Sequence, residues 1–204
     1  VQKRASKGKI LLRKIILASA SLRRIELLKK HGLSFEVVVS GADENIKNFS
    51  DSTDYVLKAS LQKAASVFNK LYGQMINKSD DTIIIAADTA VVLDNEIYGK
   101  PESIDHAYQM LNSLSGREHK VVTGVTIVHA SNGIGMFKQA YEQTTVKFKK
   151  LSDREIKDYL SLGEYADKAG GYAIQGSAAA FVEQIDGDME NVIGLPTNKV
   201  LQLL

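Results

Sequence analysis

Apolar and polar positions along the chain follow two periods, which predict helices and strands that interleave. An apolar run at 15–18 ends at Ser19-Ala20-Ser21, and apolar residues then recur every three or four positions as far as His31-Gly32. This pattern predicts a strand, a tight turn and a helix that is ended by Gly32. A second strand is expected at 35–39, and a long amphipathic helix from 53 to about 76.

The middle of the chain reads mainly as strands. A β-branched run at 82–87 leads into Asp88-Thr89, so Asp88 is expected to terminate a buried strand, and 90–98 resembles a hairpin around Asp94-Asn95-Glu96. A helix at 103–115 has Ser103 as its N-cap. Alternation at 120–129 and 136–148 then predicts two long antiparallel strands.

The last part of the chain continues the alternation of elements. A capping box opens a helix at 152–162, a glycine-rich stretch covers 170–176, a strand is expected near 179–185, and a helix follows Pro196. We therefore expect an α/β fold with a mixed, twisted sheet and flanking helices.

Composition narrows the function classes. The 204 residues are 44% hydrophobic and include no cysteine. The absence of cysteine excludes a disulfide scaffold, a thiolate zinc site and cysteine catalysis, and it fits a reducing compartment such as the cytoplasm. No apolar run approaches the 18 residues that a membrane span needs, so no membrane partner is expected.

Basic residues concentrate at the start of the sequence. Six cations precede the first acidic residue, whereas residues 15–204 carry 20 basic and 24 acidic side chains. We expect residues 1–13 to form a flexible basic arm (a targeting remnant, a tether to an anionic surface, or only a solvated end) and residues 14–204 to form one domain. A mildly acidic body argues against nucleic acid as a partner.

The segment from Ser19 to Arg24 is the first candidate for chemistry. It lies at the start of a predicted helix, where unpaired N–H groups and the positive end of the dipole attract anions. Arg23 and Arg24 are unfavourable there unless an anion is bound. The alternative is that both arginines are solvated or pair with carboxylates elsewhere.

Three further segments carry candidate groups. Asp88 could bind a metal or act as a general base, or it could only cap a turn. Lys100, held between Gly99 and Pro101, could present its ammonium to a phosphate. Gln175 ends the glycine-rich stretch and could hydrogen bond a nucleobase edge, although such a stretch is as often a plain surface loop. The histidines show no zinc-ligand spacing, and His119 reads as a structural histidine in a turn or strand.

In their order along the chain, these segments resemble the Maf family. The matching segments are Leu17 to Leu28, Ala87 to Val91, Gly99 to Pro101, Leu114 to Gly124, Asp167 to Gly176, and Val192 to Pro196. Members of that family are nucleoside triphosphate pyrophosphatases whose fold is similar to that of inosine triphosphatases, with two lobes around a central cleft. The resemblance covers about residues 15–204.

The resemblance implies roles for individual residues. The catalytic base falls on Asp88, metal ligation on Asp88 and Glu44, and base preference on Arg23, Thr89 and Gln175. This last set resembles the branch that cleaves dTTP and UTP. The remaining substrate contacts fall on Ser19, Ser21, Arg24, Lys63 and Lys100. One departure is Leu22, where the family has a proline that would fix φ at the first helical position.

The expected function is therefore hydrolysis of the α–β phosphoanhydride of dTTP or UTP, with Mg²⁺ or Mn²⁺ as cofactor, as a house-cleaning reaction in the cytoplasm. Relatives are often dimers, so a homodimer is an open expectation. Two alternatives stand beside this one. One is a non-enzymatic nucleotide sensor that regulates cell division, and the other is a pyrophosphatase for purine triphosphates such as inosine or 7-methylguanosine triphosphate.

Overall fold

One mixed sheet organises the part of the chain that the structure describes. The computed structural model describes residues 13–42, 46–73 and 81–204. Glu44, nearly all of the basic arm and the end of the helix expected at 53–76 lie outside these residues. The sheet has the order β2-β1-β3-β5-β6-β7, with β4 also paired to β3. Its strands are β1 (Lys14–Leu17), β2 (Glu36–Val37), β3 (Thr82–Leu93), β4 (Glu96–Tyr98), β5 (Glu118–Ser131), β6 (Ile134–Phe148) and β7 (Val182–Asp186).

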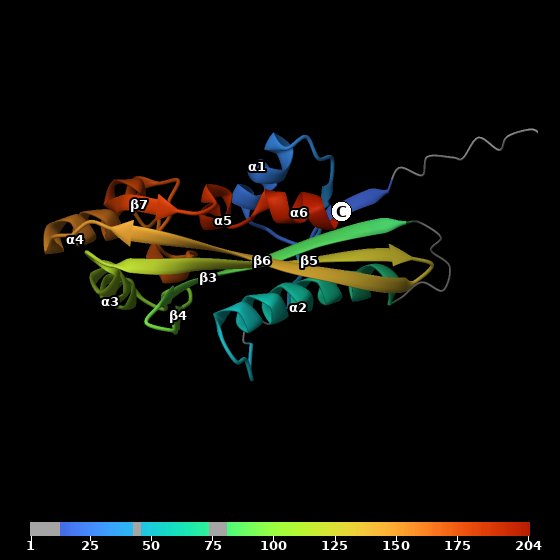
Figure 1. The fold of residues 1–204 in the computed structure, drawn as a ribbon, viewed down its shortest axis with the longest axis horizontal. Helices are drawn as coiled ribbons and strands as arrows, with labels where there is room; N and C mark the ends of the chain where they lie inside the picture. The colour runs from blue at the N-terminus through green and yellow to red at the C-terminus, as the bar shows by residue number, and fades with distance from the viewer. Residues whose placement is uncertain (1–12, 43–45, 74–80) are drawn as a thin grey trace, which may run out of the picture.

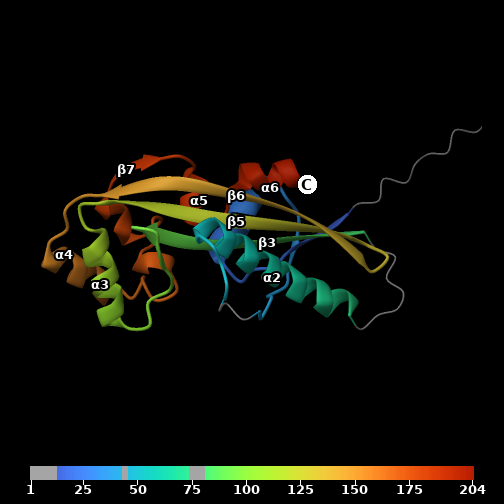
Figure 2. The ribbon, with the colours of Figure 1, turned by 60° about the horizontal axis from the view of Figure 1, so that its bottom comes forward.

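Helices cover both faces of this sheet. They are α1 (Leu22–Lys30), α2 (Ser52–Tyr72), α3 (Ile104–Leu114), α4 (Asp153–Ser161), α5 (Met189–Ile193) and α6 (Thr197–Leu203), with 3₁₀ turns at Ala169–Gly171 and Ser177–Phe181. The long β5–β6 hairpin runs along most of the molecule, and α3, α4 and β7 gather at one end of it (Figure 1). After rotation, α2 lies against one face of the sheet and α6 against the other (Figure 2).

The alternation of side chains along strand β3 explains why both faces of the sheet are buried. Ile84 and Ala86 pack with residues of α2, whereas Ile83, Ile85 and Ala87 pack with residues of α1 and α6. Successive side chains of a strand point to opposite faces, so a strand buried on both sides reads as a continuous apolar run. A third cluster packs α3 and α4 around Phe148 and forms the other lobe.

Most of the predicted elements are confirmed, including the Ser103 cap, the capping box at Ser152 and the helix after Pro196. The structure differs from the sequence-based expectation at four places. The strand expected at 35–39 spans only Glu36–Val37, the strand expected near 179–185 begins at Val182 after a 3₁₀ turn, and helix α5 was not predicted. The fourth concerns Asp88, which does not terminate a strand. The ladder with β5 continues through it, with Asp88 opposite Gly124, and carries β3 on to Leu93.

Candidate active site

A cleft of about 930 Å³ opens where the parallel part of the sheet ends. The pairing of β1 with β3 stops at Leu17 and Ile85, so β3 continues beyond its neighbour, and Asp88 and Thr89 on this continuation line the cleft. Every candidate residue in the described part of the chain lines this cleft, namely Ser19, Ser21, Arg23, Arg24, Lys63, Asp88, Thr89, Lys100 and Gln175. Glu44 was the remaining candidate, and it lies outside the described residues.

Strand period places Asp88 and Thr89 on opposite faces of β3. Asp88 continues the even-numbered series that faces α2, and Lys63 of α2 donates to its Oδ1 atom at 2.5 Å. Lys63 is only 9% exposed. A buried ammonium needs such a partner because the loss of hydration is costly for an isolated charge. The pair therefore fixes a carboxylate and a cation side by side in the cleft.

Thr89 faces the other side and meets Arg24 of α1. The Arg24 guanidinium donates from Nη2 to Thr89 Oγ1 at 3.1 Å and from Nε to the carbonyl oxygen of Gly194 at 2.8 Å. Thr89 also shares a hydrogen bond of 2.9 Å with Thr123 on β5. Arg24 thus connects the start of α1, strand β3 and the segment after α5, and this bracing role was not foreseen.

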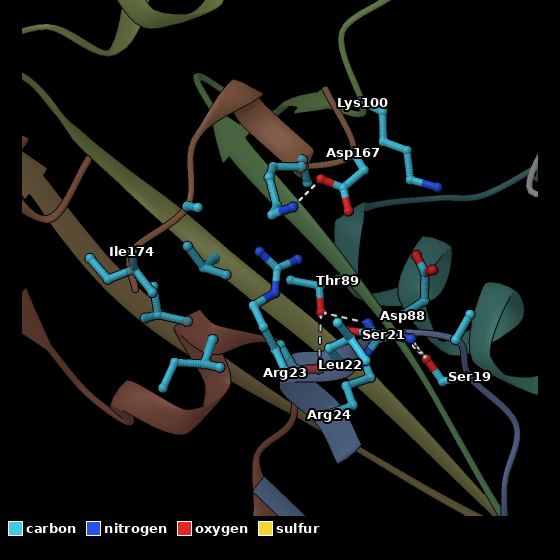
Figure 3. A pocket seen from close by; sticks show the side chains of 18 of the residues that line it. Ser19, Ser21, Leu22, Arg23, Arg24, Asp88, Thr89, Lys100, Asp167 and Ile174 are labelled. Atoms are coloured by element: carbon cyan, nitrogen blue, oxygen red, sulfur yellow. Dashed lines mark hydrogen bonds and ion pairs between the residues drawn. The ribbon is translucent and has the colours of Figure 1, made fainter. Parts of the chain in front are cut away.

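Arg23 is the arginine that extends into the cleft, toward the Asp167 carboxylate (Figure 3). Burial lowers the pKa of Arg23, and the nearby negative charge of Asp167 opposes that effect. Asp167 accepts a hydrogen bond from the ammonium of its neighbour Lys168, which lowers the pKa of Asp167. Asp167 and Lys168 line the same cleft, although their sequence context gave them no role.

Three contacts hold the segment that carries these residues and Gln175. The backbone N–H of Gly170 donates to the carbonyl of Gly99 at 3.0 Å, which ties the segment to the loop of Lys100. Gly170 has φ = +68°, and a Cβ there would approach the Val91 side chain to 3.0 Å, so only glycine suits this position. The hydroxyl of Tyr159 accepts from the N–H of Ala173 at 3.2 Å.

The third contact is a hydrogen bond of 2.8 Å between His119 Nε2 and the Tyr172 hydroxyl. His119 is 2% exposed and packs edge-on against Phe148 and Tyr172. Burial lowers the pKa of His119 to about 4 and raises that of Tyr172, so both groups stay neutral near pH 7. The prediction of a histidine held in a strand is confirmed by its place in β5, although only Nε2 has a hydrogen-bond partner and the buried Nδ1 has none.

The described residues contain no group of three or more histidines and carboxylates able to hold a metal ion. Asp88 is the carboxylate that pairs with Lys63 in the cleft, and Asp167 lies beside Lys168 and Arg23. Mg²⁺ characteristically uses one or two carboxylates together with substrate phosphates and water, so this donor set is compatible with a metal that arrives with a nucleotide. Among the same residues, no helix has the length and apolar character needed to cross a membrane.

Comparison with known proteins identifies the chain's relatives. The family model described as "Maf-like protein" matches residues 14–204. The chain is 45% identical to the dTTP/UTP pyrophosphatase of Thermoanaerobacter sp. (strain X514) over 94% of this chain and 95% of the relative. Its identity to the dTTP/UTP pyrophosphatase of Clostridium tetani is also 45%, over 93% and 95% of the two chains. The chain belongs to the Maf family.

Among solved structures, the Ham1 protein of Staphylococcus aureus matches this Maf chain with a TM-score of 0.45 and 15% identity, over 67% of this chain and 72% of the other. The sheet and its flanking helices themselves confirm the mixed α/β fold expected from the sequence.

Sequence reasoning missed three features of this Maf site. Asp167 and Lys168 fall within a matching segment, but a charged pair in a turn is common and carries no periodic pattern. The hydrogen bond between His119 and Tyr172 joins two segments that are distant in the sequence. The only signal for it in the sequence is that both matching segments occur in the same chain. Arg24 holds Gly194 and Thr89, whereas Arg23 extends into the cleft (Figure 3). This difference depends on the position of Gly194, which the sequence alone does not give.

Proposed function

We propose that this Maf chain hydrolyses the α–β phosphoanhydride of a pyrimidine nucleoside triphosphate, dTTP or UTP, to the monophosphate and pyrophosphate. The observation that carries the proposal is the Asp88–Lys63 pair, held at 2.5 Å in a cleft that Arg23, Lys100 and the start of α1 also line. A general base beside several cations is the arrangement that attack by water on a polyanionic phosphate requires. The names of the two bacterial relatives agree with it.

The start of α1 provides the anion site. Ser21 is the N-cap residue, and its own N–H donates to Ser19 Oγ at 3.1 Å. The Ser21 side chain makes no capping hydrogen bond, so no side-chain cap occupies the first N–H groups of the helix. These groups point along the positive end of the helix dipole. A phosphate placed there shares the cleft with Lys63 and Lys100. These donors stabilise the charge that accumulates on the leaving pyrophosphate.

Asp88 orients and deprotonates the attacking water in this proposal. Lys63 occupies Oδ1, which leaves the other carboxylate oxygen for the water and fixes the plane of the group. A divalent ion such as Mg²⁺ or Mn²⁺ would be held by Asp88 and by substrate phosphates, with Glu44 as a further ligand implied by the resemblance. When bound, such an ion neutralises phosphate charge and polarises the attacked phosphorus.

The test is an assay of purified protein with Mg²⁺ against a panel of canonical and modified triphosphates, with pyrophosphate and orthophosphate measured separately. Pyrophosphate release with preference for dTTP and UTP supports the proposal. Orthophosphate release refutes it, as does preference for inosine or 7-methylguanosine triphosphate. Tight nucleotide binding without turnover favours a nucleotide sensor instead. The cysteine-free sequence fits a reducing compartment, and we propose the cytoplasm as the place of this activity.

A further inference from the structure

Asp167, Lys168 and Arg23 form an ordered set of polar groups in the cleft. The Lys168 ammonium donates to the Asp167 carboxylate. The Arg23 guanidinium extends toward Asp167 (Figure 3), and the charge of each group shifts the pKa of the other. Both basic groups only donate hydrogen bonds, and an ionised carboxylate only accepts them. The set therefore presents a donor, an acceptor and a donor.

Asp167 is an acceptor throughout the neutral pH range. Its pKa is lowered first by the hydrogen bond from Lys168 and then by the charges of Lys168 and Arg23, while burial acts in the opposite direction. A protonated carboxyl could donate a hydrogen bond as well as accept one. Because Lys168 and Arg23 keep Asp167 ionised, its carboxylate only accepts hydrogen bonds. A ligand group that faces Asp167 must therefore be a donor.

The position of Asp167 in the cleft separates it from the catalytic groups. Figure 3 shows Ser19 and Asp88 on one side and Ile174 on the opposite side, with Arg23 and Asp167 between them. A carboxylate beside a triphosphate is repelled by it unless it holds a metal ion or activates the water, roles already assigned to Asp88, whereas Asp167 is paired with Lys168. The neutral part of a nucleotide is the suitable neighbour, and the apolar residues that line the cleft, among them Ala173, Ile174 and Val192, suit the face of a base.

The Watson–Crick edge of uracil and thymine is complementary to this set. It presents O4 as an acceptor, N3–H as a donor and O2 as an acceptor. Cytosine presents an amino donor at position 4 and an acceptor at N3, so it would set its N3 lone pair against the carboxylate and its amino group against a cation. The Asp167 side chain is 76% exposed, so the selectivity arises when a bound base covers it: a mismatched base then leaves the carboxylate and a cation without partners.

We propose that Asp167 accepts the N3–H of the uracil or thymine base, with Arg23 and Lys168 donating to the two flanking carbonyl oxygens, and that this triad excludes cytosine. The inference rests on the proposed function for its substrate class and names the group that selects the base. Asp167 is thus a specificity-determining residue, distinct from the groups that act on phosphate.

The test combines changes in the protein with changes in the base. We compare wild type, Asp167→Asn, Asp167→Ala and the control Asp158→Asn, which makes the same chemical change at an exposed position on α4. The substrates are UTP, CTP and N3-methyl-UTP. We expect Asp167→Asn to lower kcat/KM for UTP by about 10- to 100-fold, the range for one hydrogen bond to a charged group, and to reduce the preference for UTP over CTP by a similar factor. The control should match wild type.

N3-methyl-UTP identifies the contact itself. In wild type, methylation should lower kcat/KM at least about 10-fold, whereas in Asp167→Ala, UTP and N3-methyl-UTP should differ by no more than about 3-fold, because the partner of N3–H is gone. If Asp167→Ala lowers activity on all three substrates equally, Asp167 acts on the fold or on phosphate, and the inference is overturned. Thermal unfolding of each variant separates a loss of folding from both outcomes.

Failure of the proposed function would be recognised separately, because wild type would then release no pyrophosphate from UTP. The inference can still be tested in that case by equilibrium binding of UMP, CMP and N3-methyl-UMP. Tighter binding of UMP that disappears in Asp167→Ala supports it, and equal binding of the three nucleotides to wild type overturns it.

Discussion

Gly124 controls how closely helix α2 can approach the sheet beside the catalytic pair. It lies opposite Asp88 in the β3–β5 ladder. A Cβ at this position would lie 2.5 Å from the carbonyl oxygen of Val56 and 2.6 Å from its carbonyl carbon. Both atoms belong to the backbone of α2, so no side chain can rotate away. We predict that Gly124→Ala pushes α2 outward and loosens the contact between Lys63 and Asp88.

The size of the effect follows from this geometry. Non-bonded carbon atoms are most favourably placed at about 3.5 to 4.0 Å, so the helix must move by roughly 1 Å. Overpacking of this kind costs about 1 to 3 kcal/mol. For a chain of this length, each kcal/mol lowers Tm by about 2 to 4 °C. A misplacement of about 1 Å in a catalytic group can cost about 100-fold in rate.

The measurement is thermal and urea unfolding of Gly124→Ala, with kcat determined on the preferred triphosphate. Gly99→Ala serves as the stability control, because a Cβ at Gly99 meets nothing within 4 Å and its φ is not in the left-handed region. Gly99 lines the cleft, so it is not a control for activity. A Gly124→Ala protein with the Tm and kcat of wild type would refute the argument that close backbone packing positions Lys63.

Three further predictions concern the site and its supports. Asp88→Asn should lower kcat by about 100-fold or more with little change in KM, as expected for loss of a general base, and steady-state kinetics will show whether KM rises instead. Arg24→Lys cannot reproduce the hydrogen bonds to both Gly194 and Thr89, so its Tm should fall by several degrees. The Tm of Arg24→Ala should fall further, and calorimetry measures both values. The pKa of His119 is about 4 in the folded protein and about 6.5 in the unfolded chain. The free energy of unfolding should therefore be highest above pH 6.5 and fall by about 1.4 kcal/mol per pH unit as the pH drops toward 4. His119→Gln should remove this pH dependence, which urea unfolding at pH 7 and pH 5 measures.

Local signals account for the parts of the fold that the sequence predicted. The caps at Ser103 and Ser152 depend on residues three positions away, and the helix at 22–30 follows its own apolar period, so a single sequence contains the necessary information. The continuation of β3 through Asp88 depends on pairing with Gly124, a contact between residues distant in sequence. Helix α5 has only five residues, too few for a period to be visible.

For the candidate site, too, the sequence predicted one part and not another: it indicated which residues belong to the site, but not how they are arranged. Residues such as Lys63 and Lys100 were placed in one site by resemblance, and the structure brings them to the same cleft. Their geometry was not accessible, because it depends on which face of a strand each neighbour covers. The alternation of β3 decides that Asp88 meets α2 and Thr89 meets α1, and this follows only once both helices are known to pack on opposite faces.

Leu22 illustrates how a departure from the family pattern can leave the site intact. The resemblance implies a proline here, which would fix φ at the first helical position of α1. Helix α1 nevertheless begins at Leu22, whose side chain is 73% exposed. The turn is held by Ser19 Oγ, which accepts from the N–H of Ser21, and by Arg24, which donates to Gly194. A proline at the first helical position would contribute mainly by restricting the unfolded chain, worth about 0.4 to 1 kcal/mol. Leucine at this position therefore affects the stability of the protein more than the geometry of its anion site.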